Sequence, residues 1–146
     1  MPLRAATLFA ALAVPLLGTG LALAQTDPIT ARKDGLRRMQ GHLEAINAAA
    51  RAGGDTRALT ERTADMVAFY RSFPTLFPPG SDTPPSRALP TVWTDRAGFE
   101  AADANAVAAA EALNAAAASG DAAATGRAAQ AMGAACGNCH RGYRGR

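Results

Sequence analysis

The chain has 146 residues, of which 18% are charged, and its formal net charge is +3. This length suffices for one compact domain with a modest core, and so small a positive excess does not favour a nucleic-acid-binding protein. Only two cysteines occur, Cys136 and Cys139, and a disulfide that closes so short a loop would stabilise a fold very little.

Residues 1–24 are predicted to be a cleaved signal peptide. Arg4 is followed by an apolar run from Ala5 to Leu17 and then by small residues that end at Ala24, which is the pattern of an export signal. The apolar run is too short to span a bilayer comfortably, and polar residues follow the small ones directly. Cleavage after Ala24 would leave residues 25–146 as one periplasmic domain that has no membrane anchor.

A first helix is predicted over residues 28–51. Apolar residues recur at helical spacing along one face: Ile29, Leu36, Met39, Leu43, Ile46 and Ala50. This spacing is typical of a helix that packs into a bundle. Arg32 takes the one position of that face that is not apolar, and Gly53-Gly54 is expected to end the helix.

A second helix is expected over residues 55–73, with Asp55 or Thr56 as its N-cap. It is followed by a crossover, residues 74–94, that contains six prolines and Gly80. Prolines at this density cannot sustain a helix, and a connection of this length is usually functional or disordered.

A third helix is predicted over residues 95–118 and a fourth over residues 121–143, with Asp121 as the N-cap of the latter. The inward face of the third helix is expected to consist of Phe99, Ala102, Ala106, Ala109, Leu113 and Ala116. No segment alternates apolar and polar residues for long enough to predict a strand. The chain is therefore expected to be all-α, an antiparallel four-helix bundle with short connections within each helix pair.

The strongest chemical signal is the sequence Cys136-Gly137-Asn138-Cys139-His140. C-x-x-C-H is the attachment signature of c-type haem, because residues three and four apart share one helix face. Both thiols can then reach the two vinyl groups of the haem while the adjacent imidazole ligates its iron.

The two cysteines have three other interpretations. A redox-active C-x-x-C pair is typical of a strand and crossover pattern that this sequence lacks. A zinc site would need further ligands, and the only other histidine is His42. A chance pair is the third alternative. Haem attachment is favoured because the chain is predicted to be exported and helical throughout.

The stretch from Cys136 to Arg144 resembles the C-x-x-C-H-x-x-[FY]-R terminus of the cytochrome c′ family. Arg32 with the residues that follow it resembles the first helix of that family, and Phe77 to Gly80, Pro90 to Trp93 and Phe99 resemble its crossover and third-helix entry. The resemblance implies a four-helix bundle, commonly an antiparallel homodimer, with one haem c that is usually five-coordinate.

The resemblance also implies roles for individual residues. Leu36 would face the distal side of the haem, His140 would be the axial iron ligand, and Arg144 would lie beside the proximal face. Arg32 is expected to pair with a haem propionate because its position predicts burial, and Lys33 and Arg87 are weaker candidates for the same contact.

Leu36 can neither ligate iron nor donate a hydrogen bond, so the distal side is expected to stay open to NO or CO. The predicted function is therefore electron transfer and binding of small gases, without enzymatic activity and with an unidentified redox partner. Two alternatives remain open: a low-spin cytochrome with Met39 as sixth ligand, and a haem enzyme that acts on nitric oxide. His42 is expected to be a surface or interface residue, since it lies about 120° around the helix from Leu36.

Overall fold

The structure is a computed structural model that describes residues 27–146. The predicted signal segment and its cleavage site lie outside these residues. The described chain consists of four long helices, α1 (Pro28–Ala52), α2 (Thr60–Ser72), α4 (Arg96–Ser119) and α5 (Ala122–Tyr143), with the single-turn helix α3 (Thr91–Thr94) before α4. Short 3₁₀ segments, Thr56–Leu59 and Phe73–Leu76, flank α2. The prediction of an all-α four-helix bundle is confirmed.

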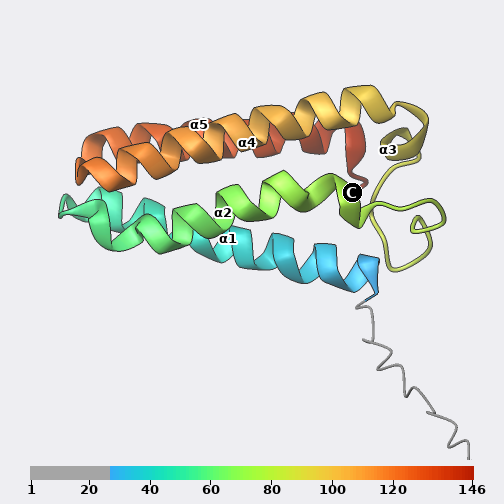
Figure 1. Cartoon of the computed structure of the whole chain (residues 1–146), viewed down its shortest axis with the longest axis horizontal. Helices are drawn as coiled ribbons and strands as arrows, with labels where there is room; N and C mark the ends of the chain where they lie inside the picture. Colours follow the sequence, from blue (N-terminus) through green and yellow to red (C-terminus); the bar gives the residue numbers. More distant parts are fainter. Residues whose placement is uncertain (1–26) are drawn as a thin grey trace, which may run out of the picture.

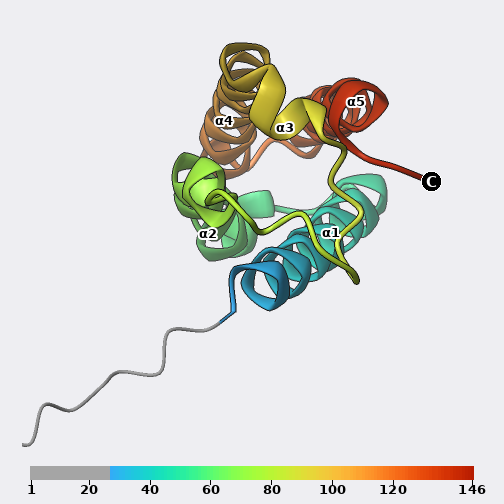
Figure 2. The same ribbon diagram turned by 90° about the vertical axis from the view of Figure 1, so that its right-hand side faces the viewer.

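The four long helices are arranged around one core in the order α1, α2, α4 and α5 (Figures 1 and 2). α4 packs against both α2 and α5, and α1 packs against α5. Neighbours in the sequence run antiparallel, because short turns join α1 to α2 and α4 to α5. The crossover between α2 and α4 runs across one end of the bundle (Figure 2). In residues 27–146 no helix is long and apolar enough to cross a membrane.

Helix ends follow local chemistry. The carboxylates of four aspartates accept hydrogen bonds from backbone N–H groups in the first helical turns: Asp27, Asp55, Asp95 and Asp121. Such caps satisfy N–H groups that have no partner within the helix. α1 and α4 end at Gly53 and Gly120, whose φ angles of 75° and 81° are in the left-handed region that glycine adopts without strain.

Two expectations about the elements were wrong in detail. The second helix was expected to begin near residue 55, whereas its first turn is the 3₁₀ segment and α2 starts at Thr60. The crossover was expected to contain no helix, yet its last four residues form α3. Proline explains the second difference, because Pro90 precedes the turn and its ring does not interrupt a helix at its start.

The inward face of α4 also differs from the prediction by one residue at three positions. The structure buries Asp103, Ala110 and Ala117, where Ala102, Ala109 and Ala116 were expected. Phe99 and Leu113 are buried in both the prediction and the structure. Between them, residues three and four positions along the helix lie on nearly the same face, so the sequence alone does not decide which of the two is buried. The sequence pattern favoured alanine over a charged residue, but packing brings Asp103 inside.

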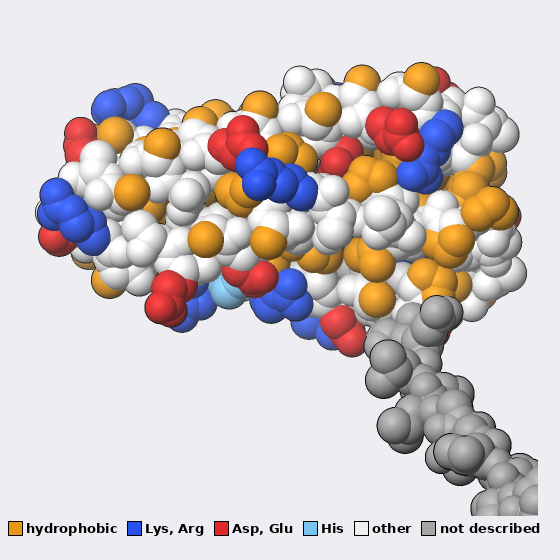
Figure 3. Space-filling view, viewed as in Figure 1, with side chains coloured by type: hydrophobic (Ala, Val, Ile, Leu, Met, Phe, Trp, Pro, Cys, Tyr) orange, Lys and Arg blue, Asp and Glu red, His pale blue; other side chains and the backbone are white. Residues whose placement is uncertain are grey.

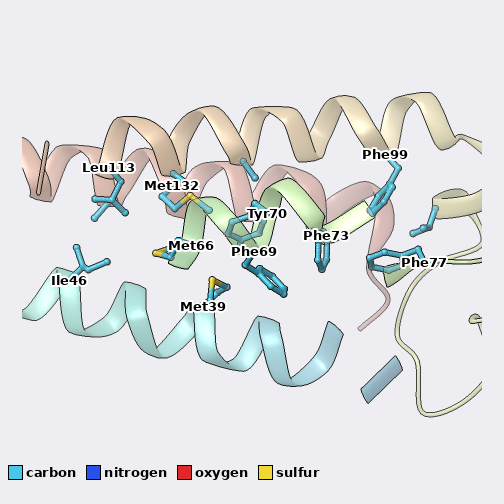
Figure 4. Packing of buried hydrophobic residues seen from close by; sticks show 14 residues of the cluster. Met39, Ile46, Met66, Phe69, Tyr70, Phe73, Phe77, Phe99, Leu113 and Met132 are labelled. Atoms are coloured by element: carbon cyan, nitrogen blue, oxygen red, sulfur yellow. The ribbon is translucent and has the colours of Figure 1, made fainter. Parts of the chain in front are cut away.

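The core is richest in aromatic side chains at the crossover end of the bundle. Figure 4 shows Phe73, Phe77 and Phe99 toward that end, and Ile46 and Leu113 toward the other. The ring centroids of Phe77 and Phe99 lie 4.9 Å apart, in an edge-to-face arrangement. α1 approaches α2 closely because residue 35 is glycine, where a Cβ atom would lie 2.2 Å from the ring of Phe69.

The surface is mixed in character. Figure 3 shows hydrophobic side chains gathered over the crossover end of one face, with both signs of charge interspersed along the bundle. This face therefore carries no single-sign charge patch of the kind that attracts nucleic acid.

Candidate functional site

A cavity of about 500 Å³ lies inside the bundle, between the first half of α1, the second half of α2, the first half of α4 and the end of α5. Its lining is mainly apolar. All eight residues that the sequence assigned to the site line this one cavity: Arg32, Lys33, Leu36, Arg87, Cys136, Cys139, His140 and Arg144. The fold thus brings together three segments that are far apart in the sequence.

The last turns of α5 supply one wall of the cavity. Cys136, Cys139 and His140 share a helix face, and both thiols are partly buried. The hydroxyl of Tyr70 lies 3.9 Å from the sulfur of Cys136. Burial raises the pKa of Cys139 to about 11 and also raises that of Cys136. Reactive dithiol pairs usually have lowered pKa values, so this environment does not favour a redox-active pair.

His140 lies at the edge of the same wall. Partial burial against the cavity lowers the pKa of its imidazole, and the nearby charge of Arg144 lowers it further. A lowered pKa keeps the ring neutral, which is the form that binds a metal ion. In residues 27–146 no three His, Cys, Asp or Glu side chains gather as ligands for a bare metal ion.

α1 supplies another wall through Leu36 and Met39. Leu36 is partly buried, while Met39 is 2% exposed. Figure 4 shows the Met39 side chain directed from α1 toward α2, near Met66. Leu36 has no atom that could ligate iron, whereas Met39, one helical turn farther along α1, carries a thioether sulfur that could. An open axial position beside Leu36 and a sixth ligand from Met39 are therefore the two alternatives for this wall.

His42 does not line the cavity. Its Nε2 atom lies 2.9 Å from Asp65, and its Nδ1 atom lies 3.2 Å from a guanidinium nitrogen of Arg62. Its side chain is 15% exposed. His42 was expected at the surface or at a subunit interface; it is partly exposed, and its side chain joins α1 to α2.

Arg32 is buried, as its position predicted, but its guanidinium is already engaged by the start of the crossover. It donates to the carbonyl oxygen of Leu76 at 3.2 Å, to the hydroxyls of Ser81 and Ser86 at 3.0 and 2.6 Å, and to the carbonyl of Ser81. The guanidinium also lies 4.6 Å from the ring centroid of Phe77. Four N–H groups are therefore used, and only the Nε–H group is left for a ligand.

Replacing Arg32 with methionine should destabilise the protein by about 3 kcal/mol, because several buried oxygen atoms of the crossover lose their donors. Urea unfolding followed by circular dichroism measures the effect. Arg37→Met is the matched control, since Arg37 is also on α1 but its side chain is 73% exposed and forms an ion pair with Asp34. Equal effects of the two substitutions would show that Arg32 does not anchor the crossover.

The crossover is joined to the end of α5, and this explains why Arg87 and Arg144 border the same cavity. The N–H of Leu89 donates to the carbonyl of Tyr143 at 3.0 Å, and the N–H of Gly145 donates to the carbonyl of Arg87 at 2.8 Å. The Tyr143 hydroxyl donates to Asp95 at 2.9 Å. These pairings fix the cationic rim relative to His140.

Sequence reasoning missed two charged residues of the lining, Arg37 and Asp103. Arg37 is exposed and adds a cation to a rim already formed by Lys33, Arg87 and Arg144. Asp103 is 6% exposed, and one of its carboxylate oxygens has no hydrogen-bond partner among the described residues. The signal that could have found it is the four-residue step from Phe99.

The residues of this cavity fit a c-type haem. Two thiols and an imidazole on one helix face are the donor set for covalent attachment and axial ligation. The volume is in the range of small-molecule pockets, and the apolar walls suit a porphyrin. The exposed cations at the rim suit its carboxylates.

Comparisons with known proteins agree with this geometry. The family model for cytochrome c′ matches residues 27–144. The chain is 38% identical over 113 residues to a cytochrome c′ of Rhodopseudomonas palustris, which covers 75% of both proteins. The crystal structure of cytochrome c′ from Rubrivivax gelatinosus is 31% identical, with a TM-score of 0.74 over 81% of this chain and 94% of that one. A ferrous cytochrome c′ variant from Alcaligenes xylosoxidans with bound NO is 23% identical, with a TM-score of 0.75 over 82% and 94% of the two chains.

Proposed function

Because the chain belongs to the cytochrome c′ family, whose members carry covalently attached haem c, we propose that it is a periplasmic haem protein that transfers electrons and binds small diatomic gases. One observation carries this proposal. α5 presents two thiols and an imidazole to a cavity that is also lined, from α1, by the apolar side chain of Leu36.

The thiols of Cys136 and Cys139 would form the two thioether bonds, and the neutral imidazole of His140 would be the axial ligand. Bound haem supplies an iron that cycles between the ferric and ferrous states and can hold a gas at an open axial position. Lys33 and Arg87 would contact the propionates, and Arg32 would add at most its Nε–H group. Arg144 would keep a positive charge near the proximal imidazole.

Leu36 would keep the distal side open. A leucine side chain gives no ligand and no hydrogen bond, so it disfavours bound water and leaves room only for small neutral molecules such as NO or CO. The Alcaligenes xylosoxidans relative with bound NO supports this part of the proposal. Family membership supports a homodimer, and a redox protein would exchange the electron.

Met39 gives a second candidate, a six-coordinate electron-transfer cytochrome. The observation in its favour is that Met39 is 2% exposed and lines the cavity one turn from Leu36. Methionine is also a common filler of irregular cores, and Met39 packs in a cluster with Met66, which favours that simpler role.

The optical spectrum of the protein, purified from a host that matures c-type cytochromes, tests the proposal. We expect a broad high-spin ferrous band that shifts when carbon monoxide is added, and the same spectrum from Met39→Leu. A sharp low-spin spectrum that does not change when carbon monoxide is added, and that is replaced by a high-spin spectrum in Met39→Leu, would select the six-coordinate alternative. Catalytic consumption of nitric oxide with an electron donor would instead identify an enzyme.

A further inference from the structure

In residues 27–146, Asp103 is the only carboxylate that lines the cavity. It lies on α4 between Phe99 and Ala106, which are buried and also face the cavity. Asp103 itself is 6% exposed, and its Oδ1 atom accepts no hydrogen bond within the described chain. A buried carboxylate without a donor is costly, and the assignments proposed above leave it unused.

Charged and titratable groups line the cavity on every wall or lie beside Asp103 on α4. They are Tyr70 of α2, Arg96 and Glu100 of α4, Arg32, Lys33 and Arg37 of α1, Arg87 of the crossover, and Cys136, Cys139, His140, Tyr143 and Arg144 of α5. Arg96 is the cation that acts most on Asp103, but its guanidinium donates to Glu100 at 2.7 Å and to the carbonyl of Pro74 at 2.9 Å. Asp103 therefore keeps most of its negative charge unneutralised.

The charge of Asp103 reaches the haem-attachment segment. Burial is the main cause of the raised pKa of the Cys139 thiol and of the Tyr70 hydroxyl, and the charge of Asp103 adds to both shifts, so its field extends to α5 and α2. Cys139 would be bonded directly to the porphyrin. A negative charge in a poorly solvated site at this position opposes the addition of an electron to the iron, and a proton on the carboxylate removes that opposition.

We infer that Asp103 lowers the reduction potential of the haem and takes up one proton when the iron is reduced. This inference rests on the haem occupying the cavity as proposed above. The electron comes from a one-electron donor, which is the redox partner in the cell or an electrode in the test. The proton comes from solvent, and the only bond that forms is the O–H bond on Asp103. Reciprocity requires that protonation of Asp103 raises the potential by the same free energy.

The sign of the pH dependence follows from burial. Burial raises the pKa of Asp103 to about 6, with Glu100 adding to the shift and Arg96 opposing it. Reduction of the iron raises this pKa further. Below the pKa in the ferric state the carboxyl is protonated in both redox states, and above the pKa in the ferrous state it is ionised in both. Between the two, the potential falls as pH rises, by at most about 59 mV for each tenfold change in proton concentration.

Spectroelectrochemical titration of the haem-loaded protein from about pH 5 to about pH 9 brackets the expected window. The wild type is compared with Asp103→Asn, which keeps the shape of the side chain, and with Glu100→Gln, which removes an exposed carboxylate one turn away. We expect the reduction potential of Asp103→Asn to stay close to the value that the wild type reaches at low pH, and to lose its dependence on pH. Glu100→Gln should keep the slope. A slope and potential in Asp103→Asn that equal those of the wild type would overturn the inference and leave the propionates as the proton acceptors.

Infrared difference spectra between the reduced and oxidised protein give an independent result if Asp103→Asn does not fold. Reduction should produce a carboxylic-acid band in the wild type that moves in Asp103→Glu. A spectrum in which no such band moves would contradict proton uptake at this site. The optical spectrum of the same samples reports haem attachment. If the proposed function is wrong, the haem is missing; if only the role of Asp103 is wrong, the haem is present but its potential does not depend on Asp103.

Discussion

Replacing both Cys136 and Cys139 with alanine should abolish covalent haem binding and destabilise the protein on the order of 5 kcal/mol or more, because the bundle would keep an unfilled cavity. The cavity measures about 500 Å³ and is bordered by all four long helices, so it cannot close without moving them. For a domain of this size the loss corresponds to a fall in Tm of roughly 15 °C or more.

Thermal unfolding followed by circular dichroism measures this effect, and haem staining of a denaturing gel reports the covalent bond. The single variant Cys136→Ala is the matched control, because it keeps one thioether bond and should retain most of the haem. A double variant that folds without haem and is as stable as the wild type would show that the cofactor is not part of the core.

Leu36→Ala should raise the affinity of the ferrous protein for carbon monoxide by about tenfold or more, which corresponds to roughly 1.4 kcal/mol. Leu36 lines the cavity from α1. Removing its branched end would give a gas more room without adding a polar group. Equilibrium titration with carbon monoxide, monitored by absorption, gives the affinity.

Leu43→Ala is the control for Leu36→Ala. Leu43 also lies on α1, is also partly buried and also lines the cavity, two turns farther along. Both substitutions should cost about 2–3 kcal/mol of stability, so a general loosening of the bundle would affect them equally. An increase in affinity that is as large in Leu43→Ala as in Leu36→Ala would contradict a distal position for Leu36.

The prediction of the site succeeded where short sequence spacing carries the chemistry. Cys136, Cys139 and His140 are within four residues on one helix, so their shared face follows from helical geometry alone. Leu36 followed from the resemblance to a known family. Whether these residues hold the haem as proposed is what the spectra and the variants test.

The surroundings of Arg32 could not be predicted in the same way. Its burial followed from its position on the apolar face of α1, but its partners Ser81 and Ser86 lie 49 and 54 residues away in the crossover. Hydrophobic periodicity does not predict a hydrogen bond between residues so far apart in the sequence. A propionate therefore seemed the natural partner for a buried cation, whereas the fold supplies hydroxyl and carbonyl oxygens instead.

The sequence by itself determined the four helices, most of their caps and the haem-attachment motif, because each depends on residues within one or two turns of one another. Tertiary structure alone decided that Asp103 faces the cavity, that His42 joins Asp65, and that Arg32 is held by the crossover. The physical reason is that one residue turns a helix by about 100°, so apolar periodicity leaves a face uncertain by one position. Only the packing of neighbouring helices removes that uncertainty.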